Sequence, residues 1–360
     1  MQNWVHQWPQ YTNSSYKDQP LVDPYASEID KKISVDGWFT PFMPDLNQSN
    51  PFVADFLIQH AIWTVEEFGI DGWRVDTYFY SDKIFLNRIN DALVKEFPAI
   101  TVVGENSMPN VVNSAYFSQN TVAFPFKHNL MGTLDFPLCY AMLDGLKQNY
   151  GWNDGVMKVY NMLATDGVYK DPMRNGIFLD NHDFDRYYSV IGEDINKYKM
   201  GITWLLTLRG IPQLYYGTEI LMKNFKDPSD AEVRRDFPGG WAADATNKFI
   251  AANRTLQENE AFDYVKALAN FRKKSPAIKT GKLMQYVPQD GVYVYFRYDN
   301  NQTIMVVSNT AKDEKKISIE RFAERTKGFT RFKNIITKAE GELKDFNLGT
   351  YQTAVYELLK

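Results

Sequence analysis

The stretch Gly69-Ile-Asp-Gly-Trp-Arg-Val-Asp-Thr-Tyr-Phe-Tyr80 contains a short apolar run that carries two charged residues, Arg74 and Asp76. Residues 72–75 are predicted to form a strand, and successive side chains of a strand point to opposite faces. Arg74 and Asp76 therefore share one face, whereas Trp73 points to the other. A cation and a carboxylate aimed together from the end of a strand form either a structural ion pair or part of an active site.

Strands and helices alternate around this stretch. A helix is predicted over 51–68, because Asn50 is a suitable cap, Pro51 suits the first turn, and Gly69 ends the apolar spacing. Further helices are predicted over 84–97, near 138–149, over 197–208 and over 263–274, and further strands over 100–103, 133–136, 176–179 and 210–216. This alternation predicts an α/β fold with parallel strands. Residues 1–50 show no such periodicity and are expected to be irregular.

Three acidic residues follow three different predicted strands: Asp76, Glu105 and Asp183. In a parallel α/β barrel, catalytic groups gather at the carboxyl ends of the strands. A pair of carboxylates is what glycoside hydrolysis uses, one attacking the anomeric carbon and the other protonating the departing oxygen. A single acid in such a place is more often a helix cap or a surface ion pair. Three at equivalent positions, with Arg74 and His182 beside them, favour an active site.

These segments resemble the α-amylase superfamily, glycoside hydrolase family 13. GWRVDTYFY is similar to the segment of the family's catalytic nucleophile, which falls on Asp76, and the family's preceding arginine falls on Arg74. VVGENS is similar to the acid/base segment, which implies that Glu105 is the proton donor. FLDNHDFDR is similar to the segment with a His-Asp pair, here His182 and Asp183, and the resemblance implies that this aspartate stabilises the transition state.

Further segments support the resemblance. MPDLN at 43–47 and GIPQLYYGTE at 210–219 also match, so that the similarity covers roughly residues 36–220, and RRDFPGGW at 234–241 resembles the cyclomaltodextrinase and neopullulanase branch. The resemblance implies a (β/α)8 TIM-barrel type, here with barrel strands 4–8 only, followed by a small antiparallel β-sandwich. The expected domains are a partial catalytic barrel over 1–278, which includes part of the long loop after strand 3, and an all-β domain over 279–360.

The nucleophile strand begins near residue 72, which leaves no room for three preceding strand–helix units. The family's early Asp-x-x-x-Asn-His segment is also absent from this sequence. An N-terminally truncated barrel is therefore expected, whose unpaired strand edges favour aggregation unless they are covered. Three explanations stay open: a separate polypeptide supplies the missing part, the chain pairs with another copy of itself, or the chain is a truncated gene product.

The implied activity is retaining, double-displacement hydrolysis of α-1,4-glucosidic bonds in maltooligosaccharides, cyclodextrins, pullulan or starch. Retention requires the carboxyl groups of Asp76 and Glu105 to lie ~5–5.5 Å apart. Candidate substrate-binding residues are Arg74, His182, Trp73, Tyr78, Tyr80, Trp38 and Trp241, although simple packing is about as common for each aromatic ring. Two alternatives stay open: an inactive remnant or glucan-binding protein, and transglycosylation, in which a sugar intercepts the glycosyl enzyme.

The amino-acid composition argues against several other functional classes of protein. Lys and Arg number 40 against 44 Asp and Glu, so no nucleic-acid partner is expected. Cys139 is the only cysteine and the four histidines are scattered, which disfavours a metal-dependent hydrolase. The proposed chemistry needs no metal; structural calcium occurs in the family, but its ligands are not assignable here.

No run reaches the ~20 apolar residues of a membrane span. MQNWVHQWPQ does not have the pattern of a secretory signal, and a bacterial periplasmic or cytoplasmic location stays open.

Overall fold

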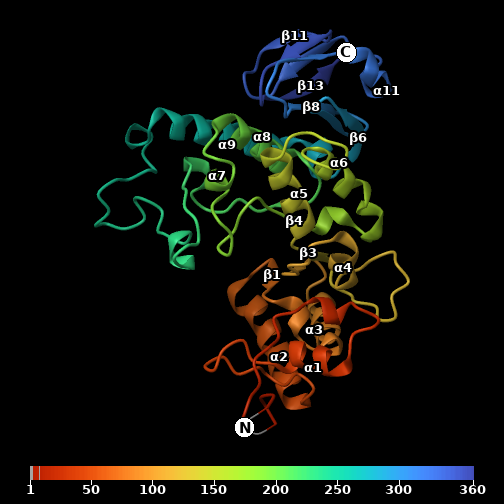
Figure 1. Cartoon of the computed structure of the whole chain (residues 1–360), viewed down its shortest axis with the longest axis vertical. Coiled ribbons are helices and arrows are strands. Elements are labelled where there is room, and N and C mark those ends of the chain that lie inside the picture. The colour runs from red at the N-terminus through yellow and green to blue at the C-terminus, as the bar shows by residue number, and fades with distance from the viewer. Residues whose placement is uncertain (1–2, 8) are drawn as a thin grey trace. The chain divides into compact units, whose positions relative to one another are not determined.

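The computed structural model of the chain describes residues 3–7 and 9–360 (Figure 1). The chain forms two compact units. The first unit comprises residues 1–137 and 165–176, and the second comprises residues 138–164 and 177–360. Among the described residues, no helix is both long enough and apolar enough to cross a membrane.

The first unit is built on a small parallel sheet with the order β1-β2-β3. Its strands are β1 (Gly72–Val75), β2 (Thr101–Gly104) and β3 (Gly132–Thr133), and its helices are α1 (Glu28–Asp36), α2 (Pro51–Phe68), α3 (Lys83–Glu96) and α4 (Val111–Tyr116). In the ladder between β1 and β2, Arg74 lies opposite Val103 and Val75 lies opposite Gly104. The residues that follow these two strands therefore emerge at the same edge of the sheet.

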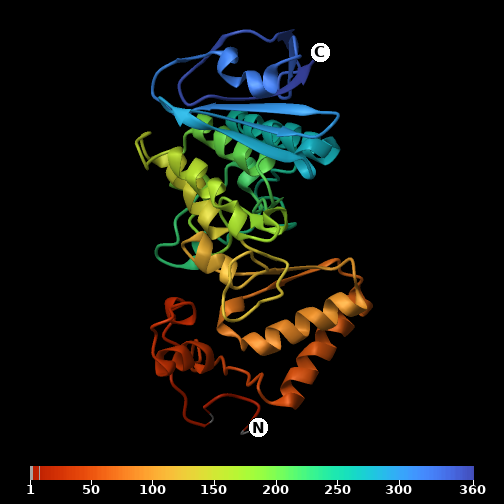
Figure 2. The same cartoon turned by 90° about the vertical axis from the view of Figure 1, so that its right-hand side faces the viewer.

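Helix α2 begins and ends where its sequence predicts. The Asn50 side chain accepts a hydrogen bond from the Phe52 amide at 3.0 Å, and Pro51 occupies the first turn. Gly69 adopts the left-handed conformation at φ 60° and donates its amide to the Val65 carbonyl. One face of α2 packs into the core of the first unit, and α2 and α3 are the neighbouring orange helices of Figure 2.

The expectation that residues 1–50 are wholly irregular is wrong for helix α1. Ser27 caps this helix by accepting the Asp30 amide at 3.2 Å, and a 3-10 turn over Gln19–Leu21 precedes it. The sequence Glu28–Asp36 is short and mostly polar, so the helical spacing of Ile29 and Ile33 is a weak signal.

The predicted parallel strands after β2 are shorter than expected. The observed β3 stops before Phe136, which already belongs to helix α5, and β4 and β5 comprise two residues each, Gly176–Ile177 and Ile211–Pro212. Pro212 has no amide hydrogen, which limits the ladder at β5. Strands β3, β4 and β5 are neighbours in the order in which they occur in the chain. A parallel bridge between Leu134 and Gly176 joins β3 to β4, and β4 pairs with β5.

The second unit contains the remaining helices. They are α5 (Phe136–Lys147, which begins at the end of the first unit), α6 (Met157–Ala164), α7 (Tyr187–Val190), α8 (Ile195–Thr207), α9 (Leu256–Lys274), α10 (Pro276–Lys279) and α11 (Ala323–Thr326). Short 3-10 helices of this unit span Thr218–Ile220, Asp230–Glu232, Ala251–Asn253 and Ile319–Phe322, whereas Tyr78–Tyr80, Asp166–Val168 and Pro172–Arg174 belong to the first unit. Arg272 of α9 donates to the carbonyls of Leu206, Leu208 and Gly210, which satisfies acceptors around the end of α8.

The C-terminal part of the second unit is an antiparallel sheet with the order β11-β10-β13-β8-β7-β6, drawn in blue in Figure 1. Its strands are β6 (Lys282–Gln289), β7 (Val292–Tyr298), β8 (Thr303–Asn309), β10 (Arg331–Asn334), β11 (Glu340–Glu342) and β13 (Thr353–Leu359), and β9 (Lys315–Ile317) and β12 (Phe346–Leu348) form a separate ladder. Ile317 and Leu348 from this ladder share a core with Phe296 and Val307 of the larger sheet. The antiparallel character expected after residue 278 is thereby confirmed.

Candidate active site

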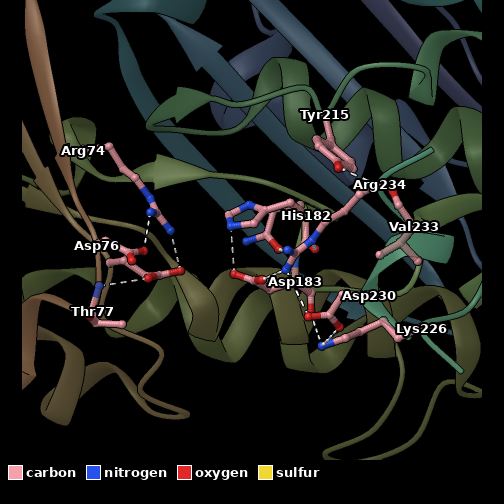
Figure 3. A network of polar contacts seen from close by, with 12 residues as sticks. Arg74, Asp76, Thr77, His182, Asp183, Tyr215, Lys226, Asp230, Val233 and Arg234 are labelled. Atoms are coloured by element: carbon pink, nitrogen blue, oxygen red, sulfur yellow. Dashed lines mark hydrogen bonds and ion pairs between the residues drawn. The ribbon is translucent and has the colours of Figure 1, made fainter. Parts of the chain in front are cut away.

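Arg74 binds both predicted catalytic acids of the first unit. Its Nη1 forms an ion pair with Asp76, and its Nη2 lies 2.6 Å from Oε1 of Glu105 (the Arg74, Asp76 and Thr77 sticks of Figure 3). The parallel register makes this possible, because Asp76 follows β1 and Glu105 follows the neighbouring strand β2. The interpretation of Arg74 as a partner of Asp76 is confirmed, and its bond to Glu105 is an additional finding.

Backbone contacts fix the position of Glu105. Its amide donates to the Val75 carbonyl at 2.9 Å, and the Tyr78 amide donates to the Glu105 carbonyl at 3.1 Å. The Thr77 amide donates to Oε2 of Glu105 at 3.0 Å. Thr77 adopts φ 42°, a left-handed conformation that is uncommon for a β-branched residue. Such strain is found at functional sites, and here it accompanies the amide's bond to the carboxylate.

The two carboxylates of the first unit have different surroundings. Glu105 is only 8% exposed, and its burial raises the pKa of its carboxyl group. The Thr77 amide and the Arg74 charge lower this pKa, whereas the hydrogen bond and charge of Asp76 raise it, and the net effect is upward. The Asp76 side chain, by contrast, is 69% exposed. Paired carboxyl groups in unlike environments are suited to different roles in acid–base chemistry.

In the second unit, Asp183 lies at the centre of a group of charged residues that we call the Asp183 network: His182, Asp183, Lys226, Asp230 and Arg234. Arg234 Nη2 donates to Oδ1 of Asp183 at 2.6 Å, and its Nε donates to the His182 carbonyl at 2.7 Å (Figure 3). His182 Nε2 lies 3.1 Å from Oδ2 of Asp183. Both oxygens of this half-exposed carboxylate are therefore oriented by neighbouring side chains.

Lys226 and Asp230 complete the Asp183 network. Lys226 Nζ donates to the Asp183 carbonyl at 3.0 Å and lies 3.1 Å from Asp230, which also pairs with Arg234. The hydrogen bond with Lys226 lowers the pKa of Asp230. Sequence reasoning missed Lys226, Asp230 and Arg234 as site residues. The only available signal was the motif that begins at Arg234, which indicated a branch of the family and no particular contact.

A buried carboxyl group anchors the segment just before the His182–Asp183 pair. Asp180 accepts the Tyr187 amide at 2.7 Å and the Thr218 hydroxyl at 3.4 Å. It is fully enclosed, and this burial raises its pKa to about 6. Arg186, whose guanidinium lies 4.3 Å from the Tyr215 ring centre, lowers that pKa in part. Asp180 thus fixes the backbone from which His182 and Asp183 project.

Two of the proposed sugar-stacking rings are buried within the first unit. Tyr78 is fully buried, and its hydroxyl accepts a hydrogen bond from Asn90 at 2.9 Å. Trp38 is also buried; it stacks on Tyr11 at 4.5 Å and donates its Nε1 hydrogen to the His6 carbonyl at 2.9 Å. Both rings are therefore packing surfaces here, which corrects the expectation that they lie open to a sugar.

The other three rings differ in exposure. Trp73 is half-buried against the core of the first unit. Tyr80 is also half-buried, meets Phe39 edge-on at 5.1 Å, and has its pKa raised to about 12 mainly by burial. Trp241 is 65% exposed, and its Nε1 donates to Asp236 at 2.9 Å. Of the five predicted rings, Trp241 offers the most open face for a sugar.

The arrangement of His, Cys, Asp and Glu side chains bears on metal ligation. Within residues 3–7 and 9–360, no group of three or more His, Cys, Asp or Glu side chains is arranged to hold a metal ion. The structure therefore assigns no ligands to the calcium ion that the resemblance raised as a possibility.

Comparison with known protein families agrees with this arrangement. The α-amylase catalytic domain matches residues 36–281, and the cyclomaltodextrinase C-terminal domain matches residues 283–357. The first match covers more than half of the chain. The chain therefore belongs to the α-amylase catalytic domain family, and its fold is of the TIM-barrel type followed by an antiparallel β domain.

Individual relatives share about a quarter of the aligned residues with this chain. A cyclomaltodextrinase from Geobacillus thermopakistaniensis is 26% identical over 313 residues, covering 84% of this chain and 48% of the relative. A cyclomaltodextrin glucanotransferase from Thermoanaerobacterium thermosulfurigenes is 24% identical over 327 residues, covering 88% of this chain and 41% of that enzyme. The chain thus spans half or less of the length of these curated relatives.

A solved structure shows the same fold. The crystal structure of an α-amylase from Geobacillus thermoleovorans complexed with acarbose superimposes with a TM-score of 0.76 at 23% identity. The match covers 99% of this chain and 72% of that one. The predicted fold class is thereby confirmed, whereas the roles of individual site residues stay predictions.

Proposed function

We propose that this chain is a retaining glycoside hydrolase that cleaves α-1,4-glucosidic bonds of maltooligosaccharides, cyclodextrins, pullulan or starch. The observation that carries the proposal is the contact of one guanidinium, from Arg74, with two carboxylates in unlike environments, Asp76 and Glu105. Membership in the α-amylase family and relatives named as cyclomaltodextrinases support the choice of substrate class.

In the proposed first step, an oxygen of Asp76 bonds to the anomeric carbon while Glu105 gives its proton to the departing glycosidic oxygen. Burial favours the protonated form of Glu105 that this step requires. In the second step, Glu105 takes a proton from water, and the water oxygen replaces Asp76 at the same carbon. Arg74 orients both carboxylates, and the Thr77 amide holds Glu105 in place.

The Asp183 network would bind sugar hydroxyls. Arg234 and His182 orient the Asp183 carboxylate, and a carboxylate accepts about four hydrogen bonds in total. The remaining acceptor positions are then available to substrate hydroxyls, whose bonds strengthen as positive charge develops on the sugar. Arg234, Lys226 and Asp230 are positioning residues in this proposal.

Two further activities are compatible with the same residues. The similarity to a glucanotransferase supports transglycosylation, in which a sugar hydroxyl replaces water in the second step. A glucan-binding protein without catalysis would keep the Asp183 network and the exposed Trp241, but it would not need the raised pKa of Glu105. That pKa favours catalysis, by hydrolysis or by transfer, over binding alone.

Product analysis tests the proposal directly. Purified chain is incubated with maltoheptaose and, separately, with β-cyclodextrin, and products are separated by chromatography. The expected result is short maltooligosaccharides that disappear with Asp76→Asn and persist with Asp71→Asn, an exposed aspartate on the same segment. Larger products than the substrate would identify transfer. Soluble, folded protein that forms no product from either substrate would contradict the proposal.

We also propose that the first unit contacts a second polypeptide, either another copy of this chain or a separate one. Four exposed aromatic residues follow one another along α2: Phe52, Phe56, Trp63 and Phe68. The rings of Phe56, His60, Trp63 and Phe68 contact one another in series, and exposed apolar surface of this kind is typical of an interaction surface. Light scattering after gel filtration would reveal a dimer, or a complex with a co-purified chain, that Phe56→Asp disrupts. A monomer that is unaffected by the substitution would contradict the proposal.

A further inference from the structure

The first unit contains a cavity of about 360 Å³ that the proposed catalysis does not use. It lies between helix α1, the beginning of α3 and the segment that follows α4. Residues that line it include Phe79, Lys83, Leu86, Tyr116, Phe117 and His128. Neither Asp76 nor Glu105 lines it, so the cavity is distinct from the candidate catalytic group of this unit.

His128 contributes buried polar atoms to the cavity wall. His128 is only 5% exposed, and neither nitrogen of its ring has a hydrogen-bond partner among the described residues. The ring is surrounded by Tyr116, Phe117 and Phe126, whose centres lie 5.2, 5.3 and 4.7 Å away. A buried donor or acceptor without a partner is costly, so a group that satisfies it is bound favourably.

Burial, together with the charge of Lys83, lowers the pKa of His128 to about 4. The imidazole is therefore neutral near pH 7, with one nitrogen that donates a hydrogen bond and one that accepts. A ligand that offers an acceptor satisfies the N–H, and an anionic acceptor gives a stronger bond than a neutral one.

Lys83 supplies positive charge at the same wall. It is the first residue of the 14-residue helix α3, and its Nζ lies 4.8 Å from the centre of the Phe126 ring, which also contacts His128. The other two lysines of the cavity are already paired, Lys31 with Glu28 and Lys32 with Asp36. Among the described residues, no carboxylate lies within ion-pair distance of Lys83. The positive end of the helix dipole adds to its charge.

We propose that this cavity binds a small organic anion that has an apolar body and one carboxylate. The carboxylate would accept hydrogen bonds from the His128 ring N–H and from Lys83, and the body would lie against Phe79, Leu86 and Phe117. The volume is at the lower end of the range of small-molecule sites, about 300–1,000 Å³, which restricts the ligand to roughly one ring and a short chain. This site is independent of the proposed glycosidase activity.

The test uses 3-phenylpropionate as the probe and uncharged 3-phenylpropionamide, which has the same shape, as its matched control. Binding to the full chain is measured by isothermal titration calorimetry, and contact is located from changes in the His128 ring signals in NMR spectra. The expected result is binding of the acid at least about tenfold tighter than that of the amide, which corresponds to one charge-assisted hydrogen bond.

Two substitutions examine the assigned contacts. Lys83→Met keeps the aliphatic stem and removes the charge, and His128→Phe keeps a ring among the surrounding aromatics and removes both nitrogens. Each is expected to reduce the preference for the acid about tenfold while the melting temperature is retained. Lys95→Met, in the last turn of the same helix, is the control for loss of surface charge and is expected to change nothing.

Equal binding of acid and amide, or no binding of either, would overturn the proposal. An equal effect of Lys83→Met and Lys95→Met would also overturn it, because the attraction would then come from the overall charge of the chain.

Discussion

Glu105 in the first unit and Asp183 in the second are both carboxylates that follow strands of the barrel type, but their surroundings are opposite. Glu105 is buried and is held by the Thr77 amide, which follows β1, and by Arg74 of β1, and its pKa is raised by burial. Asp183 is half-exposed and is held by side chains, chiefly Arg234 and His182. Burial favours the protonated form of the Glu105 carboxyl group.

The comparison shows how one residue type can take two roles. The fold supplies the first environment through strand register, because β1 and β2 bring the Thr77 amide and Arg74 to Glu105. Long-range contacts supply the second, because Arg234 lies 51 residues beyond Asp183 in the chain. Strand register therefore positions Glu105, the proposed proton donor, whereas side chains from distant segments position Asp183, the proposed stabiliser.

The largest effect is expected for Glu105→Gln, which keeps the shape of the side chain and removes the transferable proton. Hydrolysis of maltoheptaose is expected to slow about 10²–10⁴-fold, the usual contribution of a general acid. The rate of formation of reducing ends measures this, and circular dichroism verifies folding. Glu96→Gln, at the exposed end of α3, is the control. A Glu105→Gln variant with a nearly unchanged rate would break the assignment of the buried acid.

A second prediction concerns Asp180, the buried carboxyl group beside the exposed Asp183. Its folded-state pKa of about 6 lies above the value of an unfolded aspartate. Its contribution to stability is thus fully present below the unfolded pKa near 4 and is lost as pH rises through 6. Between pH 4 and 8, Asp180→Asn should gain up to about 3 kcal/mol in unfolding free energy relative to the wild type.

Urea unfolding at several pH values measures this difference. Asp263→Asn, an exposed aspartate on α9 of the same unit, is expected to track the wild type at every pH. A constant difference between Asp180→Asn and the wild type over this range would show that Asp180 is not the enclosed, proton-binding group that the structure describes.

A third prediction addresses the side chains that hold Asp183. Arg234→Met removes a charge-assisted hydrogen bond of 2.6 Å and is expected to reduce kcat/KM about 10–100-fold. The neighbouring Arg235 pairs with Glu232 instead, so Arg235→Met is the matched control and should have a much smaller effect. Steady-state kinetics with maltoheptaose compares the two. Equal losses of kcat/KM in the two variants would indicate that the positive charge of this segment matters and that the contact between Arg234 and Asp183 does not.

The smallest effect is a displacement of the pH profile by Arg74→Met. The Arg74 charge lowers the pKa of Glu105, so its removal raises that pKa further. A general acid loses activity as pH rises through its pKa, and the alkaline limb of kcat/KM should therefore move to higher pH, with a lower maximum. Arg88→Met, which breaks an exposed pair with Asp55, should leave the profile in place. A shift of the limb to lower pH would contradict the structure.

Local sequence signals predicted the elements around the first carboxylates well. The strand at 72–75 and the helix over 51–68 were predicted within their observed bounds, because both have strong terminal signals such as Asn50 and Gly69. Helix α1 was missed, because its nine residues are mostly polar and only three of them, Ile29, Ile33 and Val35, are apolar.

The candidate site was predictable only as far as its residues lie in short motifs. The positions of Asp76, Glu105 and Asp183 after strands could be inferred from the chain, and their catalytic roles stay predictions. The contacts of Lys226, Asp230 and Arg234 could not be inferred, since pairing between distant residues leaves no local period. Nor could sequence distinguish the buried ring of Tyr78 from the exposed ring of Trp241, because burial depends on packing from several elements.

The central claim is that Asp76 attacks the sugar while the buried Glu105 manages the proton. The most direct measurement is mass spectrometry of peptides after reaction with a 5-fluoro α-glycosyl fluoride, which accumulates the covalent intermediate. We expect one added glycosyl group on the peptide that contains Asp76, and none on the same peptide from Asp76→Asn. A glycosyl group on any other residue, or turnover of the reagent with no covalent intermediate, would contradict the account.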